Sequence, residues 1–293
     1  MDPSFDLDVL LIGHAAKDRN VVDGVGRTEA GGGVYFASTP LRRLGLRVAI
    51  ATRLHPDDLP LLDLVKQEGV QVYAAPAAQT SGIENTYDST DMERRVCKPL
   101  GFAGTMRPED IPDLSARIYA VVPIIAGEVD LPLLQMLARR GPVALDVQGF
   151  VRVPEGENLV FRPWQDMEEG LACVTYLKVD RAEAEHLTGQ TDLEAALHHL
   201  SAYGPSEVLV TQSSGLTVLA QGHLHRAPFT PRSMEGRTGR GDTCFATYLG
   251  KRLTASVDQS ARLAAAVTSL KQERPGPWLG SLVEAEALAA GMM

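Results

Sequence analysis

The sequence is poor in cysteine and in aromatic residues. Its 293 residues include 5% aromatics and three cysteines, Cys97, Cys173 and Cys244. This odd, scattered set excludes a disulfide-stapled fold and is typical of a reducing compartment, which predicts a cytoplasmic protein. The chain contains neither a C-x-x-C nor an H-E-x-x-H motif, so a zinc site has no support.

Long apolar runs and an excess of positive charge are missing too. The longest runs, such as Val9–Ile12 and Tyr119–Ala126, are far shorter than the about 20 residues that span a bilayer. The N-terminus carries Asp2, Asp6 and Asp8 without a basic region, so we expect no secretory signal. With 28 basic and 37 acidic side chains, the net charge is −9, whereas nucleic-acid binding needs clustered positive charge. We therefore expect neither a membrane nor a nucleic acid as a partner.

Three common site motifs are also incomplete. Gly250-Lys251 lacks both the upstream glycine and the hydroxyl of a P-loop. Gly24-Val25-Gly26 lacks the third glycine of a dinucleotide fingerprint, because residue 29 is Glu. Ser213-Ser214-Gly215 lacks the surroundings of a nucleophile elbow. Any nucleotide or phosphate site must use other residues.

What the sequence does contain is an alternation of short apolar segments and amphipathic ones. Such apolar segments are typical of parallel strands whose two faces are covered. The order predicts an α/β fold, a doubly wound, mainly parallel sheet with helices on both faces and ligands at the carboxyl ends of the strands. The expected strands are Val9–Ile12, Val48–Ala51, Ala120–Ile124, Val143–Asp146, Tyr176–Val179 and Glu207–Thr211. The expected helices are Val34–Leu44, Leu59–Glu68, Leu131–Arg140, Arg181–Leu187, Leu193–Ala202, Asp242–Leu253, Val257–Lys271 and Leu282–Ala290.

Two polar stretches, Asn20–Ala30 and Val72–Leu100, interrupt this pattern. A loop as long as the second is unusual, so a small β lid is expected, in which Ile83–Tyr87 and Arg94–Lys98 pair. A disordered insertion is the alternative. Since no linker divides the chain, we expect one domain over residues 1–293, with the lid formed from about residues 20–30 and 72–100.

The strongest local motif is Gly236–Thr243, which reads GRTGRGDT. It precedes a helix with an apolar face, and its glycines allow a tight turn toward a ligand. Amide groups at a helix N-terminus bind anions. The Asp242 carboxylate would repel an anion, but it suits a base that accepts the proton of a hydroxyl attacking phosphorus. A plain glycine turn with an N-capping aspartate is the alternative.

Gly239-Arg240-Gly241-Asp242 resembles the G-A-G-D motif of the ribokinase-like (PfkB) carbohydrate kinases. The resemblance implies that Asp242 is the catalytic base and that the amides of Gly239, Arg240 and Gly241 form an anion hole. It also implies ATP as the phosphoryl donor and Mg²⁺ as the metal. Arg240 replaces the usual alanine, and Gly236 stands where the family often has aspartate. Neither change removes the base or the backbone donors.

Other segments follow the order of the family along nearly the whole chain. Gly31-Gly32 is similar to the di-glycine motif, and Asp18 matches a position that binds substrate hydroxyls. Asp180 and Glu183 match the N-x-x-E motif. This match implies that both organise Mg²⁺ through water and that Asp180 also lies beside the donor. Thr211 with Gly215 falls where the family holds nucleotide phosphates. The helix Ala264–Lys271 and Pro275-Gly276-Pro277 resemble the wall of an adenine pocket.

Two departures bear on the substrate. Phe36 replaces an asparagine of the family, which argues against ribose or fructose, and Asp180 replaces the Asn of N-x-x-E. The segments Gly13–Asp18, Gly31–Ser38 and Asp146–Arg152 resemble the myo-inositol kinase branch. The last of them follows a strand and places Gln148 near the substrate crevice. Support of a loop is the alternative for Gln148 and Arg152.

We therefore expect an ATP-dependent phosphotransferase that acts on a hydroxyl of a small polyol, with myo-inositol or a related cyclitol as the first substrate. A sugar or nucleoside kinase of the same family and a non-catalytic relative that binds a nucleotide or a sugar are the alternatives. The acceptor hydroxyl, the preferred donor, a monovalent-cation requirement and a homodimer through the lid are left open.

Overall fold

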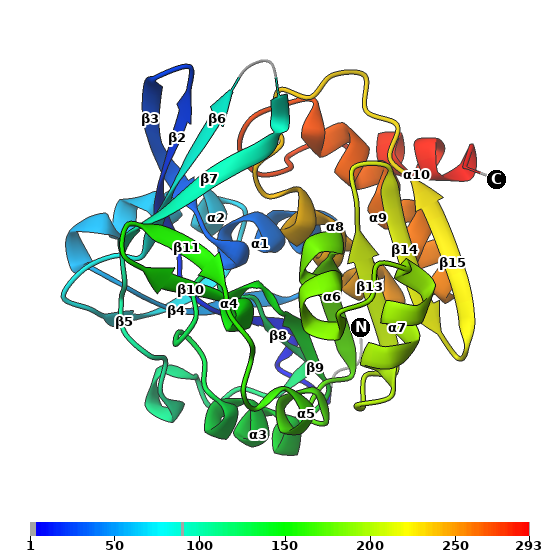
Figure 1. Ribbon diagram of the computed structural model, residues 1–293, viewed down its shortest axis with the longest axis horizontal. Helices are drawn as coiled ribbons and strands as arrows, with labels where there is room; N and C mark the ends of the chain where they lie inside the picture. The colour runs from blue at the N-terminus through cyan, green and yellow to red at the C-terminus, as the bar shows by residue number, and fades with distance from the viewer. Residues whose placement is uncertain (1–3, 89–90, 293) are drawn as a thin grey trace.

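The computed structural model describes residues 4–88 and 91–292. A nine-stranded sheet runs through the molecule in the order β15-β14-β13-β12-β9-β8-β1-β4-β5 (Figure 1). The strands from β13 to β5 are parallel, and β14 and β15 extend the sheet as an antiparallel hairpin. The predicted doubly wound, mainly parallel sheet is confirmed. The strands are β1 (Leu7–Ile12), β4 (Val48–Leu54), β5 (Gln71–Pro76), β8 (Ala116–Val121), β9 (Val143–Asp146), β12 (Tyr176–Asp180), β13 (Glu207–Thr211), β14 (Gly215–Ala220) and β15 (His223–Pro228).

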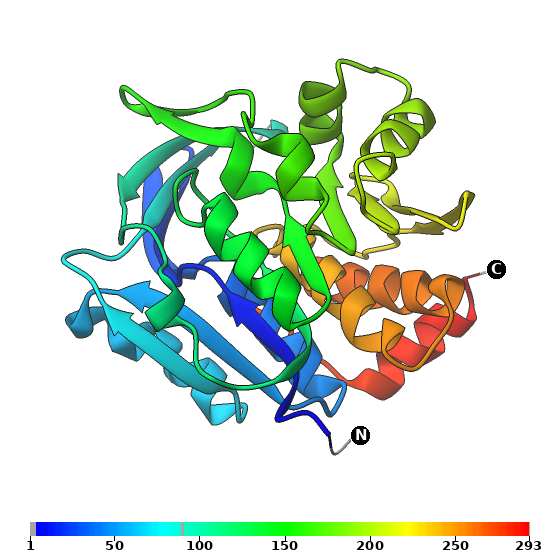
Figure 2. The same ribbon diagram turned by 90° about the horizontal axis from the view of Figure 1, so that it is seen from below.

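Helices cover both faces of this sheet because successive strand residues point to opposite sides. Val9 and Leu11 pack toward α1, α8 and α9, whereas Leu10 and Ile12 pack toward α3, α5, α6 and α7 (Figures 1 and 2). The first layer consists of α1 (Gly33–Arg43), α8 (Arg240–Arg252), α9 (Val257–Gln272) and α10 (Leu282–Ala290). The second consists of α3 (Leu131–Arg140), α5 (Met167–Leu171), α6 (Arg181–Thr188) and α7 (Leu193–Ser201).

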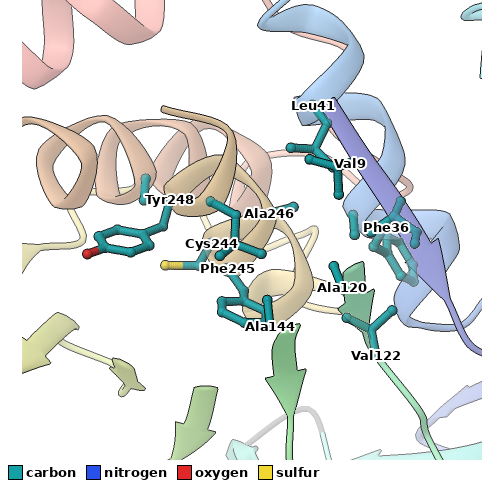
Figure 3. Packing of buried hydrophobic residues seen from close by; sticks show 14 of the residues in the cluster. Val9, Phe36, Leu41, Ala120, Val122, Ala144, Cys244, Phe245, Ala246 and Tyr248 are labelled. Carbon is teal, nitrogen blue, oxygen red and sulfur yellow. The ribbon is translucent and has the colours of Figure 1, made fainter. Parts of the chain in front are cut away.

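Helix α8 is anchored firmly in the first layer. Figure 3 shows Phe245 and Ala246 of this helix among Val9 and Ala144 from the central strands and Leu41 from α1. All five side chains are at most 2% exposed. Burial of this kind contributes about 25 cal/mol for each Å² of apolar surface. The first turn of α8, which carries Asp242, is therefore held in a fixed position.

A second, four-stranded sheet has the order β3-β2-β6-β7 and is called the lid sheet below. Its strands are β2 (Ala16–Val22), β3 (Val25–Gly31), β6 (Gly82–Asp88) and β7 (Asp91–Gly101), which stand together at the upper left of Figure 1. The predicted pairing of residues 83–87 with 94–98 is confirmed as antiparallel. The expected start of the second lid segment at Val72 is wrong. β5 pairs with β4 in the central sheet because Val72 and Ala74 pack on its core.

Several element boundaries also differ from expectation. Strand β8 ends at Val121, because Pro123 and Ile124 turn away to line a cavity. The helix expected over Leu59–Glu68 is a 3₁₀ helix, Pro56–Leu62, followed by α2, Asp63–Gln67. Pro60 lacks the amide hydrogen that an α-helix needs there. The antiparallel hairpins β14–β15 and β10–β11 (Arg152–Glu155 and Asn158–Phe161) and the short helices α4 (Gln148–Val151) and η2 (Pro108–Asp110) were not expected.

Across residues 4–88 and 91–292, every helix is too short or too polar to cross a membrane.

Candidate active site

A cavity of about 1120 Å³ lies between the carboxyl ends of the central strands and the lid sheet. Asp146, Asp180 and Thr211 line it from the ends of β9, β12 and β13, and Asp18 and Asn85 line it from β2 and β6. The edge where parallel strands end is the usual ligand site of such sheets. Among the predicted site residues, those that line the cavity are Asp18, Gly32, Gln148, Asp180, Thr211, Gly239, Arg240, Gly241 and Asp242.

Helix α8 begins directly after a glycine in the left-handed conformation. Gly239 has φ = 81°, and a Cβ at this position would lie 2.2 Å from the ring of Phe36. Only glycine therefore fits, because another residue would be strained and would collide with the ring. Phe36 forms the floor beneath the turn. This contact gives the aromatic side chain a packing role where the sequence suggested a role toward the substrate.

Asp242 lies in the first turn of α8 and lines the cavity. A Cβ on Gly33, at the start of α1, would lie 3.1 Å from Asp242 Oδ1. The two helix N-termini thus meet at this carboxylate. Amide dipoles at helix N-termini favour the ionised form of a carboxylate, which is the form that a base requires.

The amides predicted to form an anion hole lie at the start of α8. The Gly241 amide lies in the first turn of α8, where helix amides have no intrahelical acceptor. The Arg240 amide, in contrast, donates to the carbonyl oxygen of Arg237 at 3.1 Å and closes a turn. Of the three predicted amides, that of Arg240 is therefore already engaged.

Lys178 brings a buried charge close to this turn. A Cβ on Gly241 would lie 3.2 Å from Lys178 Nζ, which places the ammonium next to the anion hole. Lys178 Nζ lies 2.8 Å from Asp146 Oδ2 and 4.0 Å from Glu183 Oε2. Burial alone would lower the pKa of Lys178, but these carboxylates outweigh it and raise the pKa above its ordinary value. The side chain therefore stays charged.

Arg152 supplies a second cation from the start of the β10–β11 hairpin. Its guanidinium lies 4.9 Å from the centre of the Phe161 ring, and both side chains line the cavity. One terminal nitrogen lies 3.8 Å from Asp180 Oδ2 and 3.8 Å from Glu183 Oε1, too far for direct hydrogen bonds. Arg152 Nε is buried without a hydrogen-bond partner in the described part of the chain. The group retains hydrogen-bonding capacity for an anionic ligand.

Asp180 and Glu183 take different positions from those that a direct metal site needs. They cap α6 reciprocally, since Asp180 Oδ1 accepts from the Glu183 amide at 2.8 Å and Glu183 Oε2 accepts from the Asp180 amide at 2.7 Å. Burial, with the neighbouring Asp180 carboxylate, raises the pKa of Glu183 to about 7. Glu183 does not line the cavity, and no cluster of three or more metal-ligating side chains occurs within residues 4–88 and 91–292. The donor set fits a hydrated Mg²⁺ beside Asp180 and not a direct protein-bound ion.

The side of the cavity formed by the lid sheet is lined with hydrogen-bonding groups. Asp18 Oδ1 accepts from the Ile83 amide at 2.8 Å, which links β2 to β6. A Cβ on Gly31 would lie 2.0 Å from Asp18 Oδ2, so Gly31 leaves room for this carboxylate and does not itself line the cavity. Asn85 Nδ2 donates to Asn20 Oδ1 at 3.3 Å. Gln148 Nε2 donates to the carbonyl of Ile124 at 3.3 Å, which leaves its amide oxygen to accept from a ligand.

The expected adenine wall does not reach the cavity. Gly215 starts β14, where a Cβ would lie 2.4 Å from the Ala227 carbonyl, and it does not line the cavity. The same holds for Ala264–Lys271 and Pro275–Pro277. Instead, the segment before α8 is bound to the end of α9. The Thr230 amide donates to Ser269 Oγ at 2.9 Å, and the Gly236 amide donates to the Gln272 carbonyl at 2.7 Å.

Lys271, near the end of α9, lies against this segment and was not expected to be buried. It is 2% exposed, and its ammonium donates to the Gly236 carbonyl and lies 5.5 Å from the centre of the Phe36 ring. Burial lowers the pKa of Lys271 to about 8. Because Phe36 supports Gly239, Lys271 holds the glycine turn from behind.

Sequence reasoning missed Lys178, Phe161 and Asn85. Lys178 carried a readable signal, because a lysine inside the apolar strand Tyr176–Asp180 is rarely buried without a charged partner. Phe161 and Asn85 gave no comparable signal, since an aromatic residue or an amide near a strand is common. Their position at the cavity depends on the two hairpins that carry them.

The site combines the Asp242 carboxylate, helix amides and buried cations, a set of groups suited to phosphoryl transfer. The model of the pfkB family carbohydrate kinases matches residues 20–282. The chain belongs to this family and is a carbohydrate kinase with the ribokinase-like fold.

Solved structures give closer parallels. A pyrophosphate-dependent kinase of the ribokinase family, complexed with a pyrophosphate analog and myo-inositol, is 34% identical and covers 95% of this chain and 99% of its own, with a TM-score of 0.88. A sulfate complex of such a kinase is 36% identical over 94% of this chain and 99% of its own, with a TM-score of 0.89. Ribokinase from Arabidopsis thaliana with ribose and ATP, 20% identical over 97% of this chain and 98% of its own at a TM-score of 0.75, shares the fold. The comparison with curated protein sequences yields no match.

Proposed function

We propose that this chain transfers a phosphoryl group from inorganic pyrophosphate to a hydroxyl of myo-inositol or a closely related cyclitol. The choice of pyrophosphate as the donor rests on the residues that line the part of the cavity next to Lys178 and Arg152. Lys178 and Arg152 bring two largely buried cations to a region that offers no wall for a nucleobase. Pyrophosphate has phosphates and no base, so charge alone can recognise it.

The contacts of the segment before α8 support this donor. A Cβ on Gly236 would lie 1.7 Å from the Arg274 carbonyl, so the chain there is packed as closely as glycine allows. Arg232 also forms a paired contact with Glu273, with Nε at 2.8 Å from Oε1. The adenine of ATP could lie beside α9 only if these contacts were broken. The sequence-based expectation of ATP therefore has less support than pyrophosphate.

The reaction places Asp242 between acceptor and donor. Its carboxylate accepts the proton of the acceptor hydroxyl while that oxygen forms a bond to the terminal phosphorus. The bond from that phosphorus to the bridging oxygen breaks, and inorganic phosphate leaves with the bonding pair. The Gly241 amide, Lys178 and Arg152 stabilise the charge that moves across the phosphates.

A magnesium ion, as is general in this family, would neutralise donor charge. Asp180 would hold the water shell of that ion, since its carboxylate lines the cavity and caps α6. Arg152, 3.8 Å from the same carboxylate, would limit how closely the ion approaches. On the acceptor side, Asp18, Asn85 and Gln148 would bind several hydroxyls at once, as a ring polyol offers.

The test is a matrix of donors and acceptors with product analysis by phosphorus NMR. Pyrophosphate, ATP and ADP are each combined with myo-inositol, ribose, fructose and adenosine. We expect turnover with pyrophosphate and myo-inositol, and formation of one inositol phosphate for each phosphate released. Turnover with ATP and not with pyrophosphate would refute the donor, and turnover of a sugar or nucleoside in place of myo-inositol would refute the acceptor.

A further inference from the structure

The lid sheet is joined to the rest of the molecule by four segments of chain. Gly13–Ala15 connects β1 to β2, and Gly32 connects β3 to α1. Ala77–Ser81 connects β5 to β6, and Phe102–Gly104 leaves β7. Any change in the angle of the lid sheet must bend these four segments, because they carry the chain between the lid strands and the rest of the molecule. β7 also packs against β11, where Leu159 contacts the lid residues Ile83 and Cys97.

All four segments meet at one fully buried residue, His14, three of them at its side chain and the Gly32 segment at its backbone. Its Nδ1 lies 2.7 Å from Ser81 Oγ, and the same Oγ accepts from the Ala103 amide at 2.9 Å. The Phe102 ring packs edge-on to the imidazole, with centres 5.7 Å apart. A Cβ on Gly32 would lie 2.3 Å from the His14 carbonyl oxygen, so the fourth segment is in direct contact too.

His14 is also tied to the wall of the cavity through Glu128. The fully buried Glu128 carboxylate accepts from the His14 amide and, at 3.0 Å, from the Ile124 amide. Glu128 Oε2 lies 3.5 Å from His14 Nδ1. Ile124 and Pro123 line the cavity opposite the lid sheet. The His14 imidazole thus contacts two connections of the lid, at Ser81 and Phe102, and is linked to the opposite wall through Glu128.

Movement at this point is amplified along the lid strands. β2 and β6 leave the junction side by side and are paired in parallel, with Arg19 opposite Glu84. They carry Asp18 and Asn85, which line the acceptor side of the cavity. Asp18 lies four residues beyond His14, or about 13 Å along an extended chain. A small rotation at the junction therefore displaces both groups relative to Asp242.

We propose that the His14 side chain is a positioning residue that sets the angle of the lid sheet and thereby controls acceptor binding. The assignment of the acceptor rests on the proposed function, whereas the effect on the lid sheet does not. A histidine that merely fills the core would stabilise the whole fold equally. A positioning residue, in contrast, affects the stability of the lid sheet and the binding of the acceptor selectively.

Three variants separate these roles. His14→Phe keeps a ring but removes the hydrogen bond to Ser81, and His14→Asn restores a polar atom near the position of Nδ1. Ser81→Ala removes the partner. Lys17→Met is the matched control, because the exposed Lys17 ammonium ties the same lid strand to Asp58 at 2.8 Å without touching His14.

Kinetics form the first readout. In His14→Phe we expect the KM for the acceptor to rise about tenfold, the effect of one lost hydrogen bond at the upper end of its usual range, with the KM for the donor unchanged. His14→Asn recovers most of the loss, and Lys17→Met stays near wild type. The double variant His14→Phe/Ser81→Ala is no worse than His14→Phe, because both changes remove the same contact.

Hydrogen exchange without substrates is the second readout and does not depend on the acceptor. We expect amides of β2 and β6 to exchange about tenfold faster in His14→Phe, while those of β8 and β9 keep their wild-type rates. Equal acceleration in both sheets, or an unchanged lid sheet, would overturn the proposal. If the wild type does not phosphorylate myo-inositol, the proposed function fails, and the exchange rates still decide the role of His14.

Discussion

In the proposed function, the two sides of the cavity bind their ligands by different physical means. The donor side consists of full charges on the central scaffold, with Lys178 and Arg152 within about 4 Å of Asp146, Asp180 and Glu183. The acceptor side is carried by a separate sheet and has the carboxylate of Asp18 and the amide of Asn85, held by hydrogen bonds to neighbouring strands.

This difference follows from what each ligand needs. Recognition of phosphates gains strength when charges are fixed and shielded from water, which the packed ends of β9 and β12 provide. A neutral polyol must enter and leave through the same cavity, and a sheet attached by four connections can move to admit it. We therefore expect variants of the donor side to change stability and donor binding, and variants of the lid sheet to change acceptor binding.

The largest effect is expected where the two sides meet. Asp242→Asn removes the base while it keeps the size of the side chain, so turnover should fall by about 10²–10⁴-fold. The KM values for both substrates should stay within a few-fold of wild type. Initial-rate kinetics measure both quantities. Asp258→Asn, a surface change on α9, serves as the control, and turnover near wild type in Asp242→Asn would show that another group is the base.

Lys178→Met tests the buried charges of the donor side. It leaves Asp146 without its cation, and the free energy of unfolding should fall by about 3–5 kcal/mol, as for other broken buried pairs. Lys17→Met on the lid sheet breaks an exposed pair with Asp58 and should cost less than about 1 kcal/mol. Urea denaturation of both variants gives the comparison. Equal losses would contradict the assignment of buried charge to the donor side, and Lys178→Met/Asp146→Asn should regain part of the stability.

The burial of Lys271 behind the glycine turn predicts that the free energy of unfolding depends on pH. Burial lowers its pKa from 10.5 to about 8, so between these values the unfolded chain binds more protons than the folded one. The stability of the wild type relative to Lys271→Met should therefore rise as the pH increases from about 8 to about 10.5. At about 1.4 kcal/mol per pKa unit, the rise is about 3 kcal/mol. Denaturation of both proteins at pH 7.5, 9 and 10 measures it, and a constant difference would contradict burial of the charged ammonium.

The smallest effects distinguish the two sides directly. Arg152→Met should raise the KM for the donor about 10–100-fold, since hydrogen bonds to charged groups are the stronger ones. Asn85→Ala should raise the KM for the acceptor about 2–10-fold, because it removes neutral hydrogen bonds. Each variant should leave the other KM near wild type. Crossed effects in steady-state kinetics would show that the sides do not act separately.

Much of the fold was readable from local patterns. Strands such as β9 and β13 are short, apolar runs buried on both faces, and their residues match the prediction within one or two positions. β5 and β14 were not among the strands predicted from the sequence. Gln71–Pro76 reads QVYAAP, which lacks a clear alternation of polar and apolar residues, and nothing local indicates to which sheet it belongs. Pairing partners far apart in sequence decide this point.

The same division holds for the site. The glycine turn and Asp242 were identified because a tight turn before a helix needs glycine. The aspartate directly after these glycines is then recognisable in the sequence. The environment of Glu183 was not readable, because its burial beside Lys178 and Arg152 depends on two strands and a hairpin coming together. The closed wall behind Gly236 likewise depends on α9, more than 30 residues away.

By itself, the sequence determined the alternation of strands and helices, the glycine turn and the family resemblance. These features depend on backbone conformation and on side-chain periodicity, which neighbouring residues control. The tertiary structure alone decided which cations face the donor, which wall is closed and where the lid sheet bends. Such features depend on contacts between distant segments, whose charges and hydrogen bonds take effect only once burial removes water from around them.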